Sequence, residues 1–354
     1  MKTKIRFGLY GCNMYRTRDI MEGAKAAAGE TVEVVASFDI DRDKADFAVQ
    51  KYGGKAYYEE AAFLADPDID VVLISLPAYL HADALVSTMD AGKDCYVEKP
   101  ICVDQLGREK IIAVMKRSQA RCYVGLSYRY IAPFRKVAEI LLRPEAGPIL
   151  GIHHHWLGAW QTTPPEQMGW RHSLEKSGAQ LVHHCCHVLD WFYWMGGDMK
   201  SVTAVQYTPE GVEMPHEERE ITAAFAFQKG GIAVFNLSQD SHQYVQFGTA
   251  HTENYGIRYQ WGVETHVKVY KTRSRAIDEI YEWSLTSAPG DGGEADRNRL
   301  QMTDFIDAYL QDKEMPITLH DGLRVYDFAS AIRESARAGH RVSLVHAGFA
   351  DFSL

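Results

Sequence analysis

The sequence has few of the features that mark a secreted, membrane-bound or disulfide-rich protein. Its opening residues lead into an apolar stretch at 5–10 that is too short for a signal-peptide core or a membrane span, and the other apolar runs are of strand length. The six cysteines form no CxxC pair. In a chain this long they are typical of reduced, buried thiols, so we expect a cytoplasmic protein without a signal peptide or a membrane segment.

An excess of positive charge is also missing. Lysine and arginine number 38 against 47 aspartates and glutamates, which gives a formal net charge of -9. Nucleic acids and acidic membranes attract basic surfaces, so we expect neither as a partner. No internal repeat or low-complexity segment is present, and 354 residues are more than one compact core needs, so we expect two domains.

Histidine is concentrated in one part of the chain. Seven of the 15 histidines lie within residues 153–187. A cluster of this kind is compatible with a metal site, a catalytic centre or a polar surface, and the neighbouring motifs are needed to choose among them.

The first third of the sequence alternates apolar runs with stretches that are compatible with helices. The run at 70–76 is continuous enough for a parallel strand buried on both faces. This alternation predicts a doubly wound parallel sheet with right-handed crossovers. The expected strands are 5–10, 32–38, 70–76 and 94–97, and the expected helices end near 28 or span 42–52 and 81–91.

The turn after the first expected strand departs from the dinucleotide-binding pattern G-x-G-x-x-G. Gly11 supplies the first glycine, Asn13 stands in the place of the second, and Arg16 in the place of the third. Asparagine tolerates a left-handed backbone, so the loop is compatible with nucleotide binding or with a plain strand-to-helix turn. Asp39 ends the second strand, where a carboxylate accepts ribose hydroxyls and repels the 2′-phosphate of NADP. NAD is therefore expected as the cofactor in preference to NADP. Arg42 is compatible with NADP binding, so NADP stays an alternative.

Further motifs occur in order along nearly the whole chain. The fourth expected strand ends in Glu98-Lys99-Pro100, whose lysine taken alone would be an ordinary solvated strand end. Together these motifs resemble the Gfo/Idh/MocA family of glucose–fructose oxidoreductase, inositol dehydrogenase and relatives. The motifs are Asp66-Pro67-Asp68-Ile69-Asp70-Val71-Val72, Pro77 with His81, Ala91-Gly92-Lys93, Glu98-Lys99-Pro100, 125–130, 147–151, Trp170-Arg171, His187 with Asp190, Asp321-Gly322-Leu323 and 334–339.

The resemblance implies a fold, a division into domains and an assembly. Residues 1–127 would form an NAD-binding Rossmann domain, and 128–354 an α/β domain for substrate binding and oligomerisation, built on a large, open, mainly antiparallel sheet. Alternating runs at 221–227 and 232–237, joined by Lys229-Gly230-Gly231, agree with such a sheet. Sheets of this kind in the family pack face to face, so we expect a homodimer or a homotetramer.

The resemblance also implies which residues contact the cofactor. They come from the turn after the first strand, from the ends of the later parallel strands and from the Trp170-Arg171 motif. The expected cofactor-binding residues are Gly11, Asn13, Met14, Asp39, Ser75, Pro77, His81, Glu98, Lys99 and Arg171.

Residues 180–195 contain no glycine or proline and are expected to form one helix. One face of this helix would carry His183, His187 and Asp190, because residues three and four apart are neighbours on a helix. Three interpretations are open: a polar face with hydrogen-bonded histidines, a metal site, or a catalytic site. Nothing in the family requires a metal, and we expect none.

In the family, this helix carries an Asp-x-x-x-His motif whose histidine takes a proton from the substrate hydroxyl. The histidine corresponds to His187 and the acid to His183, so this sequence departs from the family pattern. A second imidazole orients His187 but supplies no negative charge, and with Lys99 nearby the field favours a neutral, proton-accepting His187. We expect His187 to be the base, Lys99 to polarise the reacting hydroxyl, and His183 to act as a relay or a substrate ligand.

Residues with polar tips and flat aromatic faces suit a sugar ring, which offers C–H faces and hydroxyls. For a single tryptophan, core packing is the alternative. Because strands alternate faces, only one or two of residues 153–155 can reach a cleft, and we favour His154 or its neighbours. The expected substrate-binding residues are Tyr128, His154, Trp156, Trp170 and His183.

The predicted function is the NAD-dependent oxidation of a secondary hydroxyl of a sugar or glycoside. Its sharper form is oxidation at C3 of a glucosyl unit. The hydride transfer needs NAD and a base, and the expected residues supply the base. Two alternatives are open: an NAD-dependent glycosidase that works by transient oxidation, and a catalytically silent protein that senses nucleotides or sugars.

Overall fold

The structure is a computed structural model that describes residues 3–12, 14–158, 169–207, 218–271, 279–285 and 294–344. The chain forms two compact units. Unit 1 comprises Met1–Tyr130, Glu175–Gly178 and Glu294–Leu323, and unit 2 comprises Ile131–Leu174, Ala179–Gly293 and Arg324–Leu354. A boundary at 127/128 would leave residues 294–323 in the second domain, whereas their contacts in the structure are with the first.

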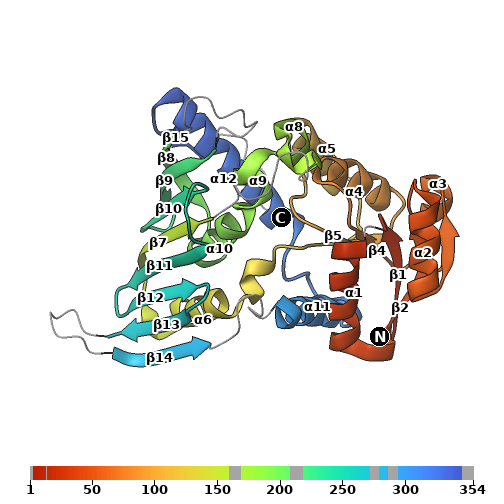
Figure 1. The fold of residues 1–354 in the computed structure, drawn as a ribbon, viewed down its shortest axis with the longest axis horizontal. Helices are drawn as coiled ribbons and strands as arrows, with labels where there is room; N and C mark the ends of the chain where they lie inside the picture. The colour runs from red at the N-terminus through yellow and green to blue at the C-terminus, as the bar shows by residue number, and fades with distance from the viewer. Residues whose placement is uncertain are drawn as a thin grey trace. The chain divides into compact units, whose positions relative to one another are not determined.

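Unit 1 is built on a parallel sheet of six strands in the order β3-β2-β1-β4-β5-β6 (Figure 1). This is the strand order of a doubly wound dinucleotide-binding fold, so the predicted fold of the first part is confirmed. The strands are β1 (Ile5–Tyr10), β2 (Val32–Phe38), β3 (Lys55–Tyr57), β4 (Val71–Ile74), β5 (Asp94–Val97) and β6 (Cys122–Val124). The helices are α1 (Met14–Ala28), α2 (Arg42–Tyr52), α3 (Glu60–Leu64), α4 (His81–Asp90), α5 (Gln105–Met115) and α11 (Glu294–Leu310).

Helix α11 belongs to unit 1 because it packs against α1 and the sheet. At Gly23 of α1, a Cβ atom would lie 2.9 Å from the backbone of Asn298, so glycine allows the two helices to approach closely. Phe305 is fully buried, with its ring centroid 5.8 Å from that of Tyr96 and 5.5 Å from that of Tyr123. Aromatic contacts of this kind stabilise the sheet face that α11 covers.

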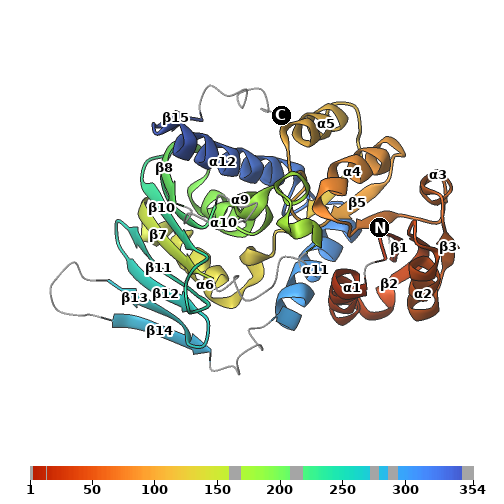
Figure 2. The ribbon, with the colours of Figure 1, turned by 45° about the horizontal axis from the view of Figure 1, so that its top comes forward.

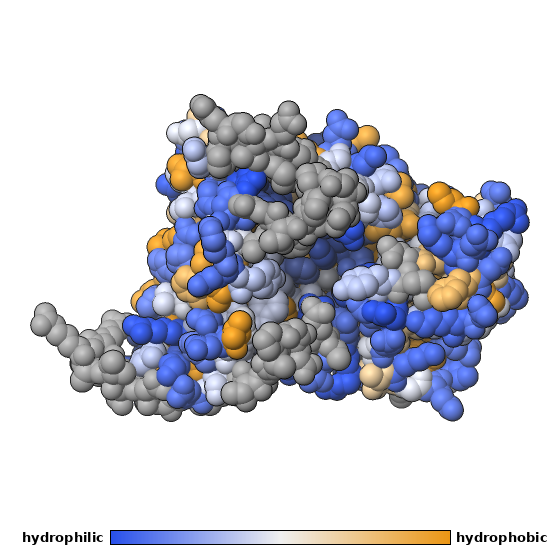
Figure 3. Space-filling model, in the orientation of Figure 1, coloured by the Kyte–Doolittle hydropathy of each residue, from blue (hydrophilic) through white to orange (hydrophobic). Residues whose placement is uncertain are grey.

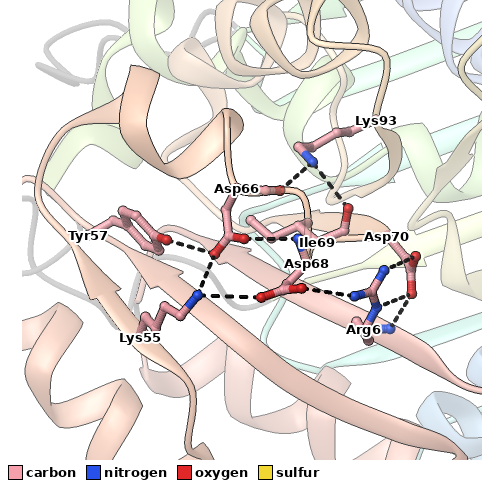
Figure 4. Close-up of polar contacts among 8 residues, drawn as sticks. All are labelled: Arg6, Lys55, Tyr57, Asp66, Asp68, Ile69, Asp70 and Lys93. Atoms are coloured by element: carbon pink, nitrogen blue, oxygen red, sulfur yellow. Dashed lines mark hydrogen bonds and ion pairs between the residues drawn. The ribbon is translucent and has the colours of Figure 1, made fainter.

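The Asp66–Asp70 motif holds the amino ends of the parallel strands (Figure 4). Arg6 donates two hydrogen bonds of 3.0 Å to the Asp70 carboxylate. Tyr57 donates to Asp66 at 2.7 Å, and this hydrogen bond raises the pKa of Tyr57 to about 12. Lys93 donates to the backbone oxygens of Asp66 and of Ile69. This motif therefore ties the amino ends of β1, β4 and β5 together, at the edge opposite to the one where such sheets bind ligands, and also holds the Tyr57 side chain at the end of β3.

Unit 2 contains a sheet of nine strands in the order β14-β13-β12-β11-β7-β10-β9-β8-β15. Among the described strands of this sheet, β7 and β10 are the one parallel pair, so the predicted mainly antiparallel sheet is confirmed. The strands are β7 (Ile149–Leu157), β8 (Met199–Tyr207), β9 (Glu220–Phe227), β10 (Ile232–Ser238), β11 (Val245–Thr252), β12 (Gly256–Trp261), β13 (Thr265–Tyr270), β14 (Glu279–Leu285) and β15 (Val342–Ser343). The helices are α6 (Ala132–Leu141), α9 (Ala179–His183), α10 (Cys186–Gly196) and the part of α12 (Leu319–Ala338) from Arg324 on.

The helices of unit 2 lie along one face of its sheet (Figures 1 and 2). Trp191 of α10 is fully buried and donates its indole N–H to the backbone oxygen of Phe134 of α6 at 3.1 Å. Among the described residues, the other face of the sheet carries no helix. Its strands accordingly alternate between buried residues toward the helices and half-exposed residues on the other side.

The histidines of β7 divide between these two faces. His154 is 0% exposed and faces the helices, whereas His153 and His155 are half-buried on the open face. The His154 ring nitrogens lie 3.0 Å from the Tyr259 hydroxyl and 3.1 Å from Oε1 of Gln246. The expectation that His154 lines the substrate cleft is therefore wrong, because both of its nitrogens are used inside the core of unit 2.

The described part of the chain has no helix with the length and the apolar character that a membrane span requires. On the face shown in Figure 3, apolar residues form small patches between hydrophilic ones.

Burial of His154 gives the first testable prediction. Burial lowers the pKa of its ring to about 3, below the value of about 6.5 for an unfolded histidine. As the pH falls, His154 becomes protonated in the unfolded chain before it does in the folded protein. The contribution of neutral His154 to the free energy of unfolding is therefore complete above pH about 6.5 and is lost as the pH falls toward 3. The unfolding free energy of His154→Gln, measured by urea titration between pH 7 and 5, should fall less steeply than that of the wild type, by up to about 1.4 kcal/mol per pH unit.

The matched control is His340→Gln, which removes an exposed histidine outside the core. At pH 7 it should leave the unfolding free energy close to that of the wild type. Equal slopes for the wild type and His154→Gln would contradict the core assignment.

Candidate active site

The turn after β1 has the geometry of a dinucleotide-binding turn at its first glycine. Gly11 has a φ of +89°, and a Cβ atom at this position would lie 2.6 Å from the backbone oxygen of Ser75. The Gly11 N–H donates to the oxygen of Phe38, and its own oxygen accepts from the Thr17 hydroxyl. Only glycine fits here, because both the backbone angle and the close approach to the end of β4 exclude a side chain.

The end of β2 is tied to this turn by Asp39. One carboxylate oxygen of Asp39 accepts the Cys12 N–H at 2.9 Å, and the other accepts the Asp41 N–H at 2.9 Å. A carboxylate oxygen has two lone pairs, so each can accept a further hydrogen bond. Asp39 is therefore fixed at the ribose position of a dinucleotide fold with acceptor capacity left for hydroxyls.

Lys99 lies directly after β5 between two anchored neighbours. The buried Glu98 carboxylate lies 3.0 Å from Nη2 of Arg16 in the first turn of α1. The Pro100 carbonyl oxygen lies 2.7 Å from Nδ1 of His81, whose Nε2 lies 2.8 Å from the carbonyl oxygen of Leu76. The backbone on both sides of Lys99 is thus held by side chains from α1 and α4.

These contacts correct the expected role of His81. Its ring is 2% exposed, and burial lowers its pKa. Both ring nitrogens face backbone oxygens of unit 1, and a neutral ring, which has one N–H, donates to one of the two. The ring therefore lies between the loops after β4 and β5 and does not present a nitrogen to the cofactor.

The remaining expected residues of unit 1 follow the same strand ends. The Ser75 N–H donates to the Tyr10 oxygen at 3.0 Å, and Pro77 precedes the turn Ala78–Leu80. Tyr128 is buried in the turn Ser127–Tyr130 after β6. Asn13 lies outside the described residues, and so does the side chain of Met14, the first residue of α1.

The expected helix at 180–195 is interrupted in unit 2. Helix α9 ends at His183 and α10 begins at Cys186. The Cys185 N–H donates to the Gln180 oxygen, five residues back, which widens the helix at this point. The prediction of one continuous helix is therefore wrong: His183 ends α9, whereas His187 and the fully buried Asp190 lie on α10.

Aromatic and cationic side chains of unit 2 form a connected row instead. The ring centroid of His183 lies 5.2 Å from that of Trp170 and 4.5 Å from that of His184. The row continues in one direction to the Arg171 guanidinium, 4.7 Å from the Trp170 ring, and in the other to Trp156, 6.5 Å from His184. This row connects four expected site residues, and His184 lies between two of them, His183 and Trp156. The four are Trp156, Trp170, Arg171 and His183. His187 follows in the first turn of α10.

Among the described residues, no three histidine, cysteine, aspartate or glutamate side chains are arranged so that they could hold a metal ion. The metal interpretation of the histidine cluster finds no support in this part of the chain.

Two family models match the chain. The N-terminal model of the Gfo/Idh/MocA oxidoreductases, described as an NAD-binding Rossmann fold, matches residues 5–126, and the C-terminal α/β model matches residues 145–344. The chain belongs to the Gfo/Idh/MocA oxidoreductase family. The family resemblance of the motifs is thereby confirmed.

Several characterised proteins are similar to this Gfo/Idh/MocA chain. A levoglucosan dehydrogenase from Pseudarthrobacter phenanthrenivorans is 24% identical over 78% of this chain and 80% of the relative. A dTDP-3,4-didehydro-2,6-dideoxy-alpha-D-glucose 3-reductase from Actinomadura kijaniata is 27% identical over 72% of each chain. Inositol 2-dehydrogenase from Salmonella typhimurium is 27% identical over 56% of each chain. A further relative, an uncharacterised oxidoreductase from Rhizobium meliloti, matches over 44% of its length. Some of the matched relatives are therefore covered over only about half of their length.

Solved structures share the fold. A levoglucosan dehydrogenase in complex with NADH and levoglucosan has a TM-score of 0.82 at 20% identity, covering 96% of this chain and 99% of that one. The WlbA dehydrogenase from Bordetella pertussis in complex with NADH and UDP-GlcNAcA has a TM-score of 0.78 at 22% identity, covering 97% and 99%.

Sequence reasoning missed three residues of this region. The sequence shows that Arg16 stands in the place of the third glycine, but it does not show that Glu98 is the partner of Arg16. His184 was not predicted, because on a regular helix it does not lie on the same face as His183 and His187. Glu218, which is buried, accepts the Leu181 N–H of α9 at 2.8 Å and pairs with Arg333, and no spacing in the sequence relates these residues.

The turn geometry gives the second prediction. Gly11→Ala and Gly53→Ala place a methyl group at the same φ of +89°, but nothing lies within 4 Å of the position at Gly53. Both variants should lose unfolding free energy to backbone strain, about 1–3 kcal/mol. Only Gly11→Ala adds the collision with Ser75, about 1–3 kcal/mol more, and only it should lose NAD binding in a calorimetric titration. Equal losses in both variants would contradict the close approach at Gly11.

Proposed function

We propose that this protein oxidises a secondary hydroxyl of a sugar or glycoside with NAD as the hydride acceptor, and that C3 of a glucosyl unit is the oxidised carbon. The observation that carries the proposal is the placement of Lys99. It stands at the ligand-binding edge of a Rossmann sheet, and its neighbours Glu98 and Pro100 are both anchored. Similarity to dehydrogenases and a reductase of sugars and cyclitols supports this substrate class.

The residues of unit 1 fit a nicotinamide dinucleotide. The turn at Gly11 packs tightly against the end of β4, as the first glycine of a dinucleotide-binding turn does, and the Asp39 carboxylate is held where it can accept ribose hydroxyls. The negative charge of Asp39 disfavours a 2′-phosphate, so NAD is the proposed cofactor and NADP the weaker one. Ser75, Pro77 and Lys99 follow the same strand ends, whereas the buried Glu98 carboxylate is paired with Arg16 and is not proposed to contact the cofactor. When bound, NAD accepts the hydride that leaves the alcohol carbon.

The protein supplies the base and the groups that hold the alcohol. His187 takes the proton of the substrate hydroxyl, Lys99 donates a hydrogen bond to the oxygen as it becomes a carbonyl, and His183 orients His187 or passes the proton on. The balance is a secondary alcohol and NAD⁺ giving a ketone, NADH and one proton.

The row of rings in unit 2 suits the substrate. Trp170 offers a flat face for the C–H side of a pyranose, and the imidazoles of His183 and His184 offer hydrogen bonds to hydroxyls, while the buried Trp156 packs against His184. Arg171, stacked on Trp170, is proposed to contact the cofactor, and Tyr128 is proposed to line the sugar site. The working form is proposed to be a homodimer or a homotetramer.

The third prediction concerns turnover. The wild type should form NADH with at least one member of a panel of sugars, cyclitols and glucosides. His187→Ala should lower kcat by about 10²- to 10⁴-fold because the base is lost, and Lys99→Met by about 10²- to 10³-fold because an oxyanion donor is lost. The measurement is NADH absorbance at saturating NAD, with exposed His340→Gln as the control.

Three outcomes would overturn this proposal. Near-normal turnover of His187→Ala would remove His187 from the chemistry. Tight binding of a panel member without NADH formation would favour a sensor. Net hydrolysis of a glycoside without accumulation of NADH would favour a glycosidase that works by transient oxidation.

The fourth prediction concerns cofactor choice. Asp39→Asn should lower kcat/KM for NAD by about tenfold and narrow the preference over NADP, because a charged acceptor of ribose hydroxyls is replaced by a neutral one. Asp41→Asn removes the same charge two residues away, where Asp41 caps α2, and serves as the control. An NAD-to-NADP ratio that is the same in Asp39→Asn as in the wild type would contradict the assignment of Asp39.

A further inference from the structure

The third glycine of the G-x-G-x-x-G spacing is replaced in this chain by Arg16. In a dinucleotide fold, a glycine at this point allows the first helix to pack closely on the sheet. Arg16 occupies the first turn of α1 with its side chain only 24% exposed. A guanidinium in this position therefore requires a partner that compensates for its lost hydration.

The partner is Glu98, the residue directly before Lys99. Nη2 of Arg16 lies 3.0 Å from Oε1 of Glu98, whose side chain is 7% exposed. Burial alone would lower the pKa of Arg16, but the nearby Glu98 carboxylate outweighs this effect and the pKa is raised. Arg16 therefore keeps its positive charge in this position.

The structure makes room for this pair. A Cβ atom at Gly125 would lie 2.9 Å from Oε1 of Glu98, so the glycine after β6 leaves space for the carboxylate. The Glu98 N–H donates to the Ile74 oxygen at 3.0 Å, which continues the pairing of β5 with β4. Glu98 is thus fixed through its backbone and its side chain.

The pair links two loops that belong to different strands. Arg16 extends from the helix that follows the turn of Gly11, and Glu98 directly follows β5, with β4 between β1 and β5 in the sheet. A buried ion pair contributes little net stability, because the cost of desolvation offsets the attraction. What it does supply is a defined distance between α1 and the loop that carries Lys99.

We propose that Arg16 is a positioning residue that acts through Glu98 to hold Lys99 in register with the dinucleotide-binding turn. It replaces the close helix–strand packing of the missing glycine with an ion pair between the cofactor turn and the lysine loop. This inference rests on the proposed function only in giving Lys99 a role at the reacting hydroxyl.

The test uses the full chain and three variants. Arg16→Met alone leaves a buried carboxylate without its partner and can fail to fold, so the main variant is Arg16→Met with Glu98→Gln, in which neither buried charge remains. Arg16→Lys keeps the charge. The matched control is Arg117→Met with Asp90→Asn, which removes an exposed ion pair of unit 1 between α4 and the end of α5.

Two measurements test the proposal. The first compares, for each variant, the change in kcat at saturating substrate with the change in the Kd for NAD. The double variant should lose about tenfold to hundredfold in kcat with the Kd changed by less than about threefold, because a displaced lysine misses the reacting oxygen while the turn still binds NAD. Arg16→Lys should recover most of kcat, and the control pair should change neither quantity.

The second readout does not depend on turnover. Reductive ¹³C-methylation labels the lysines, and the Lys99 signal is identified in NMR spectra by its loss in Lys99→Arg. In the wild type it should be a single sharp line, and in the double variant it should shift or broaden.

Each outcome decides the proposal. A double variant with wild-type kcat and a wild-type Lys99 signal would overturn it, and so would a parallel loss of kcat, NAD affinity and thermal stability, which indicates a merely structural pair. If the wild type oxidises no panel member, the proposed function fails, and the Lys99 signal alone then supports or overturns the role of Arg16.

Discussion

Parallel strand pairing is the constraint on which the candidate site of unit 1 depends. All six strands run in the same direction, so every strand ends at the same edge and every following loop begins there. Gly11, Asp39, Ser75 and Lys99 lie far apart in sequence but each stands just beyond a strand end. The same pairing places the Asp66–Asp70 motif at the opposite edge, where its carboxylates bind Arg6, Lys55 and Tyr57. One family motif is thus structural, while another carries the proposed chemistry.

The loops at this edge are held by side chains as well as by the sheet. His81 joins the backbone after β4 to the backbone after β5, and Arg16 joins α1 to Glu98. Asp39 joins the end of β2 to the turn after β1. Each is a polar group in a partly or fully buried position, where a hydrogen bond or ion pair defines geometry more than it adds net stability. A dinucleotide site benefits from this, because binding then orders fewer residues.

The histidines in the histidine-rich segment of unit 2 occupy different environments and have different contacts. His154 is a neutral core residue between Tyr259 and Gln246, whereas His183 and His184 belong to a row of rings that ends at Trp156 and Arg171. The widened turn at Gln180–Cys185 separates α9 from α10 and removes the regular spacing on which a helical-face argument depends. Local hydrogen bonding and the buried Glu218–Arg333 pair decide this region, and neither is visible in residue spacing.

The sequence by itself determined the family, the Rossmann order of the first part, the mainly antiparallel second sheet and the strand-end positions of Gly11, Asp39 and Lys99. These follow from periodicity and ordered motifs, which are local along the chain. Only the tertiary structure decided that α11 packs with unit 1, that His81 connects two loops, that His154 is buried, and that Arg16 meets Glu98 across 82 positions of chain. The physical reason is that burial and pairing depend on which elements pack together, and side-chain spacing within one element does not contain that information.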